Sequence, residues 1–452
     1  MNSEETTSTA PSSTGGLKDK FKFIAHGDRY IWSIYIMLCI VSIIEQYSAS
    51  ARIISSTDIL GPIVSHCIHL LMGLVVILVL QRIHYSKFFK IIPFFAIMSV
   101  FLSIYVMIWG DVINGARRSI NLFGIMSMQP AELIKLSAAA FIAFTLSKSQ
   151  IKGGKGVTKS GFYTTLVAIA IFGAVLIKQG TTNTIILFAI CFSMMIIGGV
   201  QWRRLFIVAG VLAAVAGCVL LYGYYGYCKK HDENGNLKAE YVGEASDKIA
   251  KGQTVDRLED VVIPRLIRWV NNDEIPKWEQ PITQYNHQEQ YSYIAQANGG
   301  VLGVFPGNSR EAARLPLAFS DYIFAIVVED MGLLGGVFLL VLYFSLLARA
   351  SGVASQCKRA FPMMLVLGMA LYIMYQALAH MGIVSGFLPV SGQPLPLISA
   401  GGSSIIITSV ALGVMLSVSR YAVRKNNSDK EDEREEINAL PEDARAENPS
   451  AL

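Results

Sequence analysis

Long apolar runs separated by short polar segments dominate the chain and predict its architecture. A helix needs about 20 apolar residues to cross the hydrocarbon core of a bilayer, since each residue advances the helix axis by about 1.5 Å. Ten such stretches can be drawn, at residues 30–49, 59–81, 91–110, 130–147, 162–178, 182–200, 203–226, 321–348, 360–384 and 403–422. The pattern therefore predicts an all-α, polytopic integral membrane protein with about ten transmembrane helices. Gly332, Gly335 and Gly336 predict a bend in the eighth helix.

Basic residues in the short loops predict how these helices are oriented. The segments on one face of the predicted bundle carry most of the Lys and Arg residues, whereas the short loops on the other face carry only Arg52, Arg117, Arg118 and Lys178. Cytoplasmic loops are enriched in Lys and Arg, so the basic face is expected to be cytoplasmic. Both termini are then cytoplasmic, and the long polar segment 228–318 is expected to form a large extracytoplasmic loop.

The two ends of the chain differ in composition from the part between them. Residues 1–28 begin with a Ser- and Thr-rich stretch without an apolar core, which indicates a disordered cytoplasmic tail and not a signal peptide. Residues 426–452 carry mixed charges and few apolar side chains, and they are also expected to be disordered. A single membrane domain is therefore predicted at residues 29–425.

Overall composition supports a membrane protein and argues against several other classes. Of the 452 residues, 53% are hydrophobic and 16% are charged, whereas soluble domains carry about 25% charged residues. The formal net charge of +5 gives no reason to expect a nucleic-acid partner. The six cysteines show neither metal-ligand spacing nor a disulfide framework, and no histidine cluster indicates a metal site. We interpret His380, which is alone in an apolar span, as a buried and hydrogen-bonded side chain.

Three acidic residues lie where the long polar segment meets the eighth apolar run. Asp321 stands at the boundary, and Glu329 and Asp330 follow inside the run. A charge at the centre of a bilayer costs roughly 2.5–3.5 kcal/mol on insertion scales, so such residues usually have a function. Alternatively, Ser320 or Asp321 caps the helix that begins there. Glu329 and Asp330 lie about 12–13 Å further along the helix axis, and we expect them to pair with polar groups of the bundle.

A second polar group opens the fourth apolar run. Pro130 suits the first turn of a helix, and Glu132 and Lys135 then lie three residues apart on one helix face. They form either a self-neutralising structural pair or the wall of an outward-facing polar cavity. Arg117 and Arg118 precede them, and their guanidinium groups suit a pyrophosphate, although two such arginines can also belong to a solvated loop.

The segment from Leu388 to Ser404 combines apolar residues with prolines. Its three prolines exclude a regular helix, and irregular backbone at membrane depth is tolerated only against protein or a water-filled cavity. We therefore expect a re-entrant or lid-like segment over an outward cavity. Ser403 and Ser404 follow two glycines at the start of the last span, where free backbone N–H groups predict either an anion site or a plain helix cap.

An amphipathic stretch at residues 257–270 lies within the long loop. Apolar residues alternate there with Arg257, Arg265 and Arg268. The pattern indicates either a helix lying on the membrane surface or a helix packed on the bundle, and the sequence does not separate the two.

Three motifs, in this order and at this spacing, resemble those of one family. They are Gly115-Ala-Arg-Arg with Gln129-Pro-Ala-Glu and Lys135; Ala297-Asn-Gly-Gly with Gly307-Asn-Ser and Ser320-Asp-Tyr-Ile-Phe-Ala; and Leu388-Pro with Pro394-Leu-Pro-Leu-Ile-Ser-Ala-Gly-Gly-Ser-Ser. From about residue 25 to 425, the chain resembles the SEDS family, the group that contains FtsW, RodA and SpoVE.

The resemblance implies a peptidoglycan glycosyltransferase that polymerises lipid II into glycan strands at the outer face of the cytoplasmic (inner) membrane. The implied partners are a class B penicillin-binding protein, which crosslinks the product, and other divisome proteins. The cell-division members resemble the sequence best, mainly through the region around Gly392 and the long N-terminal tail. The alternatives are an elongation-type polymerase and a flippase for lipid II.

The family's essential aspartate falls on Asp321, which implies a general base in an inverting single displacement. Arg117, Arg118 and Lys135 would stabilise the leaving pyrophosphate, and the implied substrate site also includes Glu132, Ser403 and Ser404. No protein metal ligand is predicted, and the resemblance leaves open whether a divalent cation takes part.

Four positions depart from the family pattern. Ser119 stands where the family usually has Trp, Ala400 where it has Tyr, Phe319-Ser320 where it has His-Thr, and residues around Thr181 replace a usual acid. These departures affect the expected substrate contacts and leave Asp321 itself unchanged.

Overall fold

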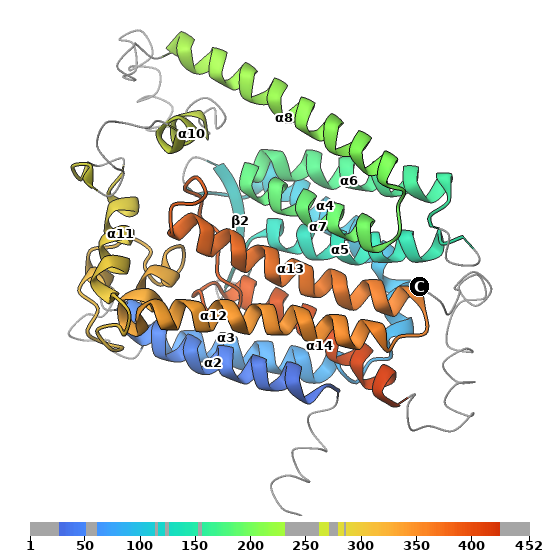
Figure 1. Cartoon of the computed structure of the whole chain (residues 1–452), viewed down its shortest axis with the longest axis horizontal. Helices are drawn as coiled ribbons and strands as arrows, with labels where there is room; N and C mark the ends of the chain where they lie inside the picture. The colour runs from blue at the N-terminus through green and yellow to red at the C-terminus, as the bar shows by residue number, and fades with distance from the viewer. Residues whose placement is uncertain are drawn as a thin grey trace, which may run out of the picture.

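The computed structural model describes residues 27–50, 61–113, 116–122, 126–151, 156–230, 262–270, 279–283 and 286–424. Ten long helices lie within these ranges: α2 (Arg29–Ala49), α3 (Gly61–Leu80), α4 (Tyr85–Trp109), α5 (Pro130–Lys148), α6 (Lys159–Gln179), α7 (Thr181–Ile197), α8 (Trp202–Lys230), α12 (Ile323–Ser355), α13 (Ala360–Val384) and α14 (Gly402–Arg424). They run side by side in one bundle (Figure 1). The tails that the sequence predicts to be disordered lie almost entirely outside the described residues.

The predicted transmembrane helices are confirmed, with shifted boundaries. Nine of the ten helices are long and apolar enough to cross a membrane, and α7 is a shorter apolar helix of 17 residues. The third helix begins at Tyr85, six residues before the apolar run, and the eighth continues to Ser355. The short separation between the fifth and sixth spans is also real, because Gly180 alone lies between α6 and α7. The chain is a multi-pass membrane protein.

A small antiparallel sheet covers one end of α4 and α5, and the sequence did not predict it. Its strands are β1 (Asp111–Ile113), β2 (Ala116–Leu122) and β3 (Met126–Met128), in the order β1-β2-β3. Strands β1 and β3 have only three residues, too few for an alternating pattern, and in β2 the run Arg117-Arg118-Ser119 interrupts the alternation. The sheet places the backbone of both arginines of the first motif in β2.

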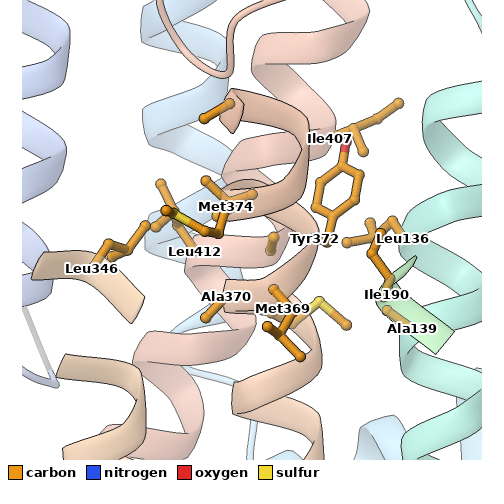
Figure 2. Packing of buried hydrophobic residues seen from close by; sticks show 14 of the residues in the cluster. Leu136, Ala139, Ile190, Leu346, Met369, Ala370, Tyr372, Met374, Ile407 and Leu412 are labelled. Atoms are coloured by element: carbon orange, nitrogen blue, oxygen red, sulfur yellow. The ribbon is translucent and has the colours of Figure 1, made fainter. Parts of the chain in front are cut away.

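The centre of the bundle is formed by α5, α13 and α14. Small side chains let α5 approach its neighbours closely, as is common where membrane helices pack, and Ala138, Ala139 and Ala143 are fully buried. Residues from five helices meet in this core (Figure 2): Leu136 and Ala139 of α5, Ile190 of α7, Leu346 of α12, Met369, Ala370, Tyr372 and Met374 of α13, and Ile407 and Leu412 of α14. In contrast, α8 lies at the edge of the bundle with most of its residues exposed (Figure 1).

The predicted bend of the eighth helix occurs at Gly332. This residue has φ 70° and ψ −174°, a conformation that glycine adopts without a Cβ clash, and it interrupts α12. A break frees backbone groups that must find other partners inside a membrane. The loop segment 299–305 supplies them: Val304 N donates to Glu329 O (2.9 Å), and Leu333 N donates to Gly300 O (2.9 Å).

Parts of the long loop fold back onto the bundle at one end. Helices α10 (Ile263–Val270) and α11 (His287–Gly299) and the short 3₁₀ helix η4 (Glu311–Ala313) lie there (Figure 1). Arg265 Nη1 donates to Val390 O (3.1 Å), and Trp269 Nε1 donates to Gly386 O (3.2 Å). For the amphipathic stretch, these bonds favour packing on the protein over lying on the membrane surface, although residues 257–261 lie outside the described part.

Candidate active site

Asp321 lies on a turn directly before α12. The helix begins at Ile323 and its N-cap residue is Tyr322, which makes no side-chain cap bond. Asp321 therefore does not occupy the cap position that the sequence left open for it. Its backbone N–H donates to Leu317 O (3.0 Å), and its Oδ1 accepts a hydrogen bond from Ser320 Oγ (3.1 Å). The side chain is half-buried, so the carboxyl group reaches the surface of this end of the bundle.

The proline-rich segment is held against this turn. Ser399 Oγ donates to Ser320 O (2.6 Å), and Ala400 N donates to Phe319 O (2.9 Å). Gly392 lies so close that a Cβ on it would stand 2.5 Å from Asp321 Oδ2. A glycine is therefore needed here for the carboxyl group to keep its position. The second and third sequence motifs meet at Asp321.

The same segment is irregular, as its prolines predict, and it is buried from residue 395 to residue 399. Residues 387–401 contain no helix, and their carbonyl groups bind side chains of the surrounding spans. Tyr343 Oη donates to Pro396 O (2.6 Å), and Ser42 Oγ donates to Leu397 O (2.8 Å). Polar side chains of α12 and α2 thus form hydrogen bonds with carbonyl groups that have no helical partner. These bonds hold the segment in place next to the turn of Asp321.

Glu132 and Lys135 form an ion pair in the centre of the bundle. Lys135 Nζ lies 3.2 Å from Glu132 Oε1, and the two side chains are 0% and 2% exposed, in that order. The ammonium group also donates to Asn183 Oδ1 (2.9 Å) and to Gln376 Oε1 (2.6 Å). All three N–H bonds of the lysine therefore have acceptors within the protein. A phosphate could contact Lys135 only if one of these bonds were exchanged.

Donors from α13 and α14 surround the carboxylate of Glu132. Tyr372 Oη donates to Oε2 (3.0 Å), Gln376 Nε2 donates to Oε1 (3.2 Å), and Ser404 Oγ lies 3.4 Å from Oε2. Ser404 thus lies beside the pair, a contact that the sequence did not predict, and its place in a substrate site stays a prediction. Ser403 is also buried, in the first turn of α14. The geometry fits a self-neutralising structural pair, one of the two interpretations that the sequence left open. Polar groups of α7, α13 and α14 extend this pair into a network.

A chain of hydrogen bonds joins this network to α12, the helix that follows Asp321. Gln376 Nε2 donates to Gln393 Oε1 (3.3 Å), and His380 Nδ1 bonds to Gln393 O (2.6 Å). The other ring nitrogen of His380 accepts from Phe324 N (3.4 Å), in the first turn of α12. Because the carbonyl can only accept, Nδ1 carries the proton. His380 is the buried, hydrogen-bonded residue that the sequence predicts.

Sequence reasoning missed several members of the network. Tyr372, Gln376 and His380 recur at intervals of four on one face of α13, and Asn183 lies in the first turn of α7. The available signal was a row of polar residues along an otherwise apolar helix, and of this row only the histidine was assigned a role from the sequence. Within the described part of the chain, no three His, Cys, Asp or Glu residues are grouped as metal ligands.

The two arginines of the first motif are placed through their backbone. Both lie in β2, where Arg117 is paired with Val112 of β1, and β2 contacts α4, α5 and α6. Their side chains are outside the described part of the structure. Ser119, the departure from the family pattern next to them, is buried.

Tyr322, the residue next to Asp321 in the turn, also carries a titratable side chain. The Tyr322 hydroxyl is buried, and this burial raises its pKa far above the ordinary value, with smaller contributions from Glu289 and Asp321. Tyr322 is therefore a neutral phenol at physiological pH. Of the two side chains, the carboxyl group of Asp321 is the one suited to accept a proton.

Comparisons with known proteins point to one family. The model of the FtsW/RodA/SpoVE family, described as cell cycle proteins, matches residues 28–424. A probable peptidoglycan glycosyltransferase FtsW from Geobacter metallireducens is 28% identical over 355 residues, which cover 78% of this chain and 83% of that protein. Stage V sporulation protein E from Bacillus subtilis is 29% identical over 342 residues, covering 75% and 80%.

Two solved structures share the fold. The rod shape determining protein RodA from Thermus thermophilus superimposes with a TM-score of 0.58 at 20% identity, covering 89% of this chain and 98% of that one. A chain from a structure described as "Structural coordination of polymerization and crosslinking by a peptidoglycan synthase complex" gives a TM-score of 0.63 at 20% identity, covering 89% and 99%.

Proposed function

Because the chain belongs to the FtsW/RodA/SpoVE family, we propose that it is a peptidoglycan glycosyltransferase that polymerises lipid II. The named relatives that match most of its length are described as peptidoglycan glycosyltransferases of the FtsW type. Septal wall synthesis is the role that fits these names. The proposed location is the cytoplasmic (inner) membrane, with both termini cytoplasmic and Asp321 at the outer face, where lipid II is used.

The proposed reaction is a single displacement at the anomeric carbon of a lipid-linked sugar. A hydroxyl group of the acceptor sugar attacks this carbon, a new glycosidic C–O bond forms, and the C–O bond to the pyrophosphate breaks with inversion. Asp321 takes the proton of the attacking hydroxyl as general base. Its half-buried place on the turn before α12 supports this role, because the carboxyl group is held in the protein and still reaches the surface.

The leaving pyrophosphate requires positive charge. Arg117 and Arg118 are proposed to bind it, since a guanidinium group can donate two parallel hydrogen bonds to phosphate oxygens. Lys135 lies deeper, and it would contribute by exchanging one of its protein acceptors for a phosphate oxygen. Glu132, Ser403 and Ser404 are proposed to hold Lys135 and the start of α14 in place for this exchange.

One observation carries the proposal most directly. Segments far apart in the sequence converge on one carboxyl group: Ser399 and Gly392 of the proline-rich segment contact the turn of Asp321. Through Gln376, the same segment is hydrogen-bonded to the buried Glu132 network. A helix cap or a lone surface acid would not require such an arrangement.

Partners are proposed on the family resemblance. A class B penicillin-binding protein would crosslink the strands that this protein makes, together with other divisome proteins. The similar fold in a complex described as coordinating polymerisation and crosslinking supports a search for such a partner.

The experiment is polymerisation of lipid II by the purified protein in detergent, with and without the partner transpeptidase. We expect glycan strands from the wild type and none from Asp321→Asn at equal amounts of folded protein. Detergent removes the need for transport, so strand formation argues against a protein that only flips lipid II. Absence of polymer with the partner present, or full activity of Asp321→Asn, would contradict the proposal.

A further inference from the structure

Two adjacent acids in α12 have very different surroundings. Glu329 and Asp330 are both fully buried, yet Glu329 has several close hydrogen-bond donors, whereas the Asp330 carboxyl group interacts with the Ser48 hydroxyl without a close hydrogen bond. We propose that Glu329 is a positioning residue that fixes the chain segment leading into Asp321. The inference rests on the proposed function, since it assigns a role in setting the geometry of that reaction.

Donors from two parts of the long loop converge on the Glu329 carboxylate. Asn298 Nδ2 lies 3.4 Å from Oε1, the Arg310 N–H donates to Oε1 (3.2 Å), and the Glu311 N–H lies 3.4 Å from both oxygens. The Ser309 hydroxyl also donates to Oε2. The carboxylate therefore accepts hydrogen bonds from the backbone N–H groups of Arg310 and Glu311, at the start of η4.

The chemistry of these contacts requires a carboxylate. All four partners are donors, and an ionised carboxylate offers two oxygens that only accept. A glutamine of the same length would direct its NH₂ group at N–H groups on one side and lose an acceptor. Hydrogen bonds to the charged form also offset the cost of burying that charge, which explains how Glu329 is tolerated inside a membrane helix.

The loop is attached to α12 at a second place next to the first. Phe305 N donates to Asp330 O (2.8 Å), and Leu334 N lies 3.3 Å from Val301 O, across the break at Gly332. A Cβ on Gly303 would collide with the Asp330 carbonyl group, so this approach of the two backbones depends on glycine. The segment 299–311 is thus joined to the helix by backbone at the break and by side chain at Glu329.

A short series of turns carries this attachment to Asp321. Leu315 N donates to Glu311 O (2.8 Å), and Leu315 is fully buried. Leu317 follows with φ 58°, a conformation that L-residues rarely adopt, and its carbonyl accepts the Asp321 N–H (3.0 Å). Since each turn leaves little freedom, a displacement at Glu311 moves the turn that holds the Asp321 carboxyl group.

The test compares Glu329→Gln with Asp330→Asn, a matched control one residue away in the same helix. Misplacement of a reacting group by about 1 Å can cost about 100-fold in rate. We expect Glu329→Gln to lower kcat by about 10- to 100-fold per folded molecule with KM nearly unchanged. Asp330→Asn should stay within about twofold of the wild type, because the amide oxygen of asparagine can keep the interaction with the Ser48 hydroxyl. Glu329→Asp, which keeps the charge, should recover part of the loss.

Hydrogen exchange provides a readout that does not depend on activity. Glu329→Gln should speed exchange at the N–H groups of Arg310 and Glu311 and in the turn at 315–322, and Asp330→Asn should not. If Glu329→Gln shows faster exchange but keeps the wild-type kcat, the positioning role is refuted and the proposed function is unaffected. Equal loss of kcat in both variants would also overturn it. If the wild type makes no polymer, the proposed function fails, and unchanged exchange in Glu329→Gln would refute the attachment separately.

Discussion

Removing Lys135 should destabilise the protein strongly, and removing Glu132 with it should restore much of the loss. Lys135→Met deletes a buried ammonium group that donates to Glu132, Asn183 and Gln376. The Glu132 carboxylate then remains buried with neutral donors only. Breaking a buried ion pair at one partner typically costs about 3–5 kcal/mol, because an uncompensated charge is left behind.

The double variant Glu132→Gln/Lys135→Met removes both charges. The glutamine can still accept from Tyr372 and Ser404, and no buried charge remains, although Asn183 Oδ1 and Gln376 Oε1 lose the Lys135 donor in both variants. Replacing a buried pair by neutral groups of similar volume is often close to neutral. We therefore expect the double variant to be destabilised by less than Lys135→Met alone, with a coupling energy of about 2–3 kcal/mol between the two sites.

Thermal unfolding in detergent and lipid II polymerisation, measured on the same samples, separate two roles of the pair. If the pair is only structural, the double variant recovers activity along with stability. If Lys135 also binds the pyrophosphate, the double variant is stable but polymerises poorly. An unfolding temperature of Lys135→Met equal to that of the wild type would refute the reasoning, and so would additive losses in the double variant.

Two further variants test close contacts elsewhere. Gly392→Ala should lower polymerisation by about 100-fold with little loss of stability, because its Cβ would stand 2.5 Å from Asp321 Oδ2 and displace the carboxyl group; a wild-type rate would contradict the assigned contact. Glu45→Gln should stabilise the protein by about 1–3 kcal/mol, because Glu45 and Asp330 are buried carboxyl groups that repel each other and the substitution removes one of them. Its thermal unfolding temperature should rise, and a fall would show that Glu45 is needed in its present form.

The sequence predicted those features that depend on one segment at a time. Apolar length determines a transmembrane helix, so the ten helices could be drawn from composition alone. The prolines near Leu388 and the glycine at Gly332 gave the irregular segment and the bend, since both act on their own backbone. The predicted pair of Glu132 and Lys135 also belongs to one helix turn.

Features that depend on two distant segments could not be predicted. The break in α12 creates free backbone groups, but the sequence does not say that residues 299–305 fill them. The contrast between Glu329 and Asp330 has the same origin, because it depends on which side of α12 the loop lies. In the same way, Gln376 looked like one polar residue in an apolar span until α5 and the proline-rich segment met around it.

Many of the polar side chains inside the bundle bond to backbone that is not helical. Ser42 and Tyr343 bind carbonyl groups of the proline-rich segment, His380 joins that segment to α12, and Glu329 binds N–H groups of the long loop. Each of these residues is therefore explained by the need to satisfy irregular backbone inside a membrane. Asp321 differs from them, because it is half-exposed and stands on the turn that this irregular backbone fixes. The polar groups of the spans thus stabilise the surroundings of Asp321, and this arrangement favours a chemical role for its carboxyl group over a structural one.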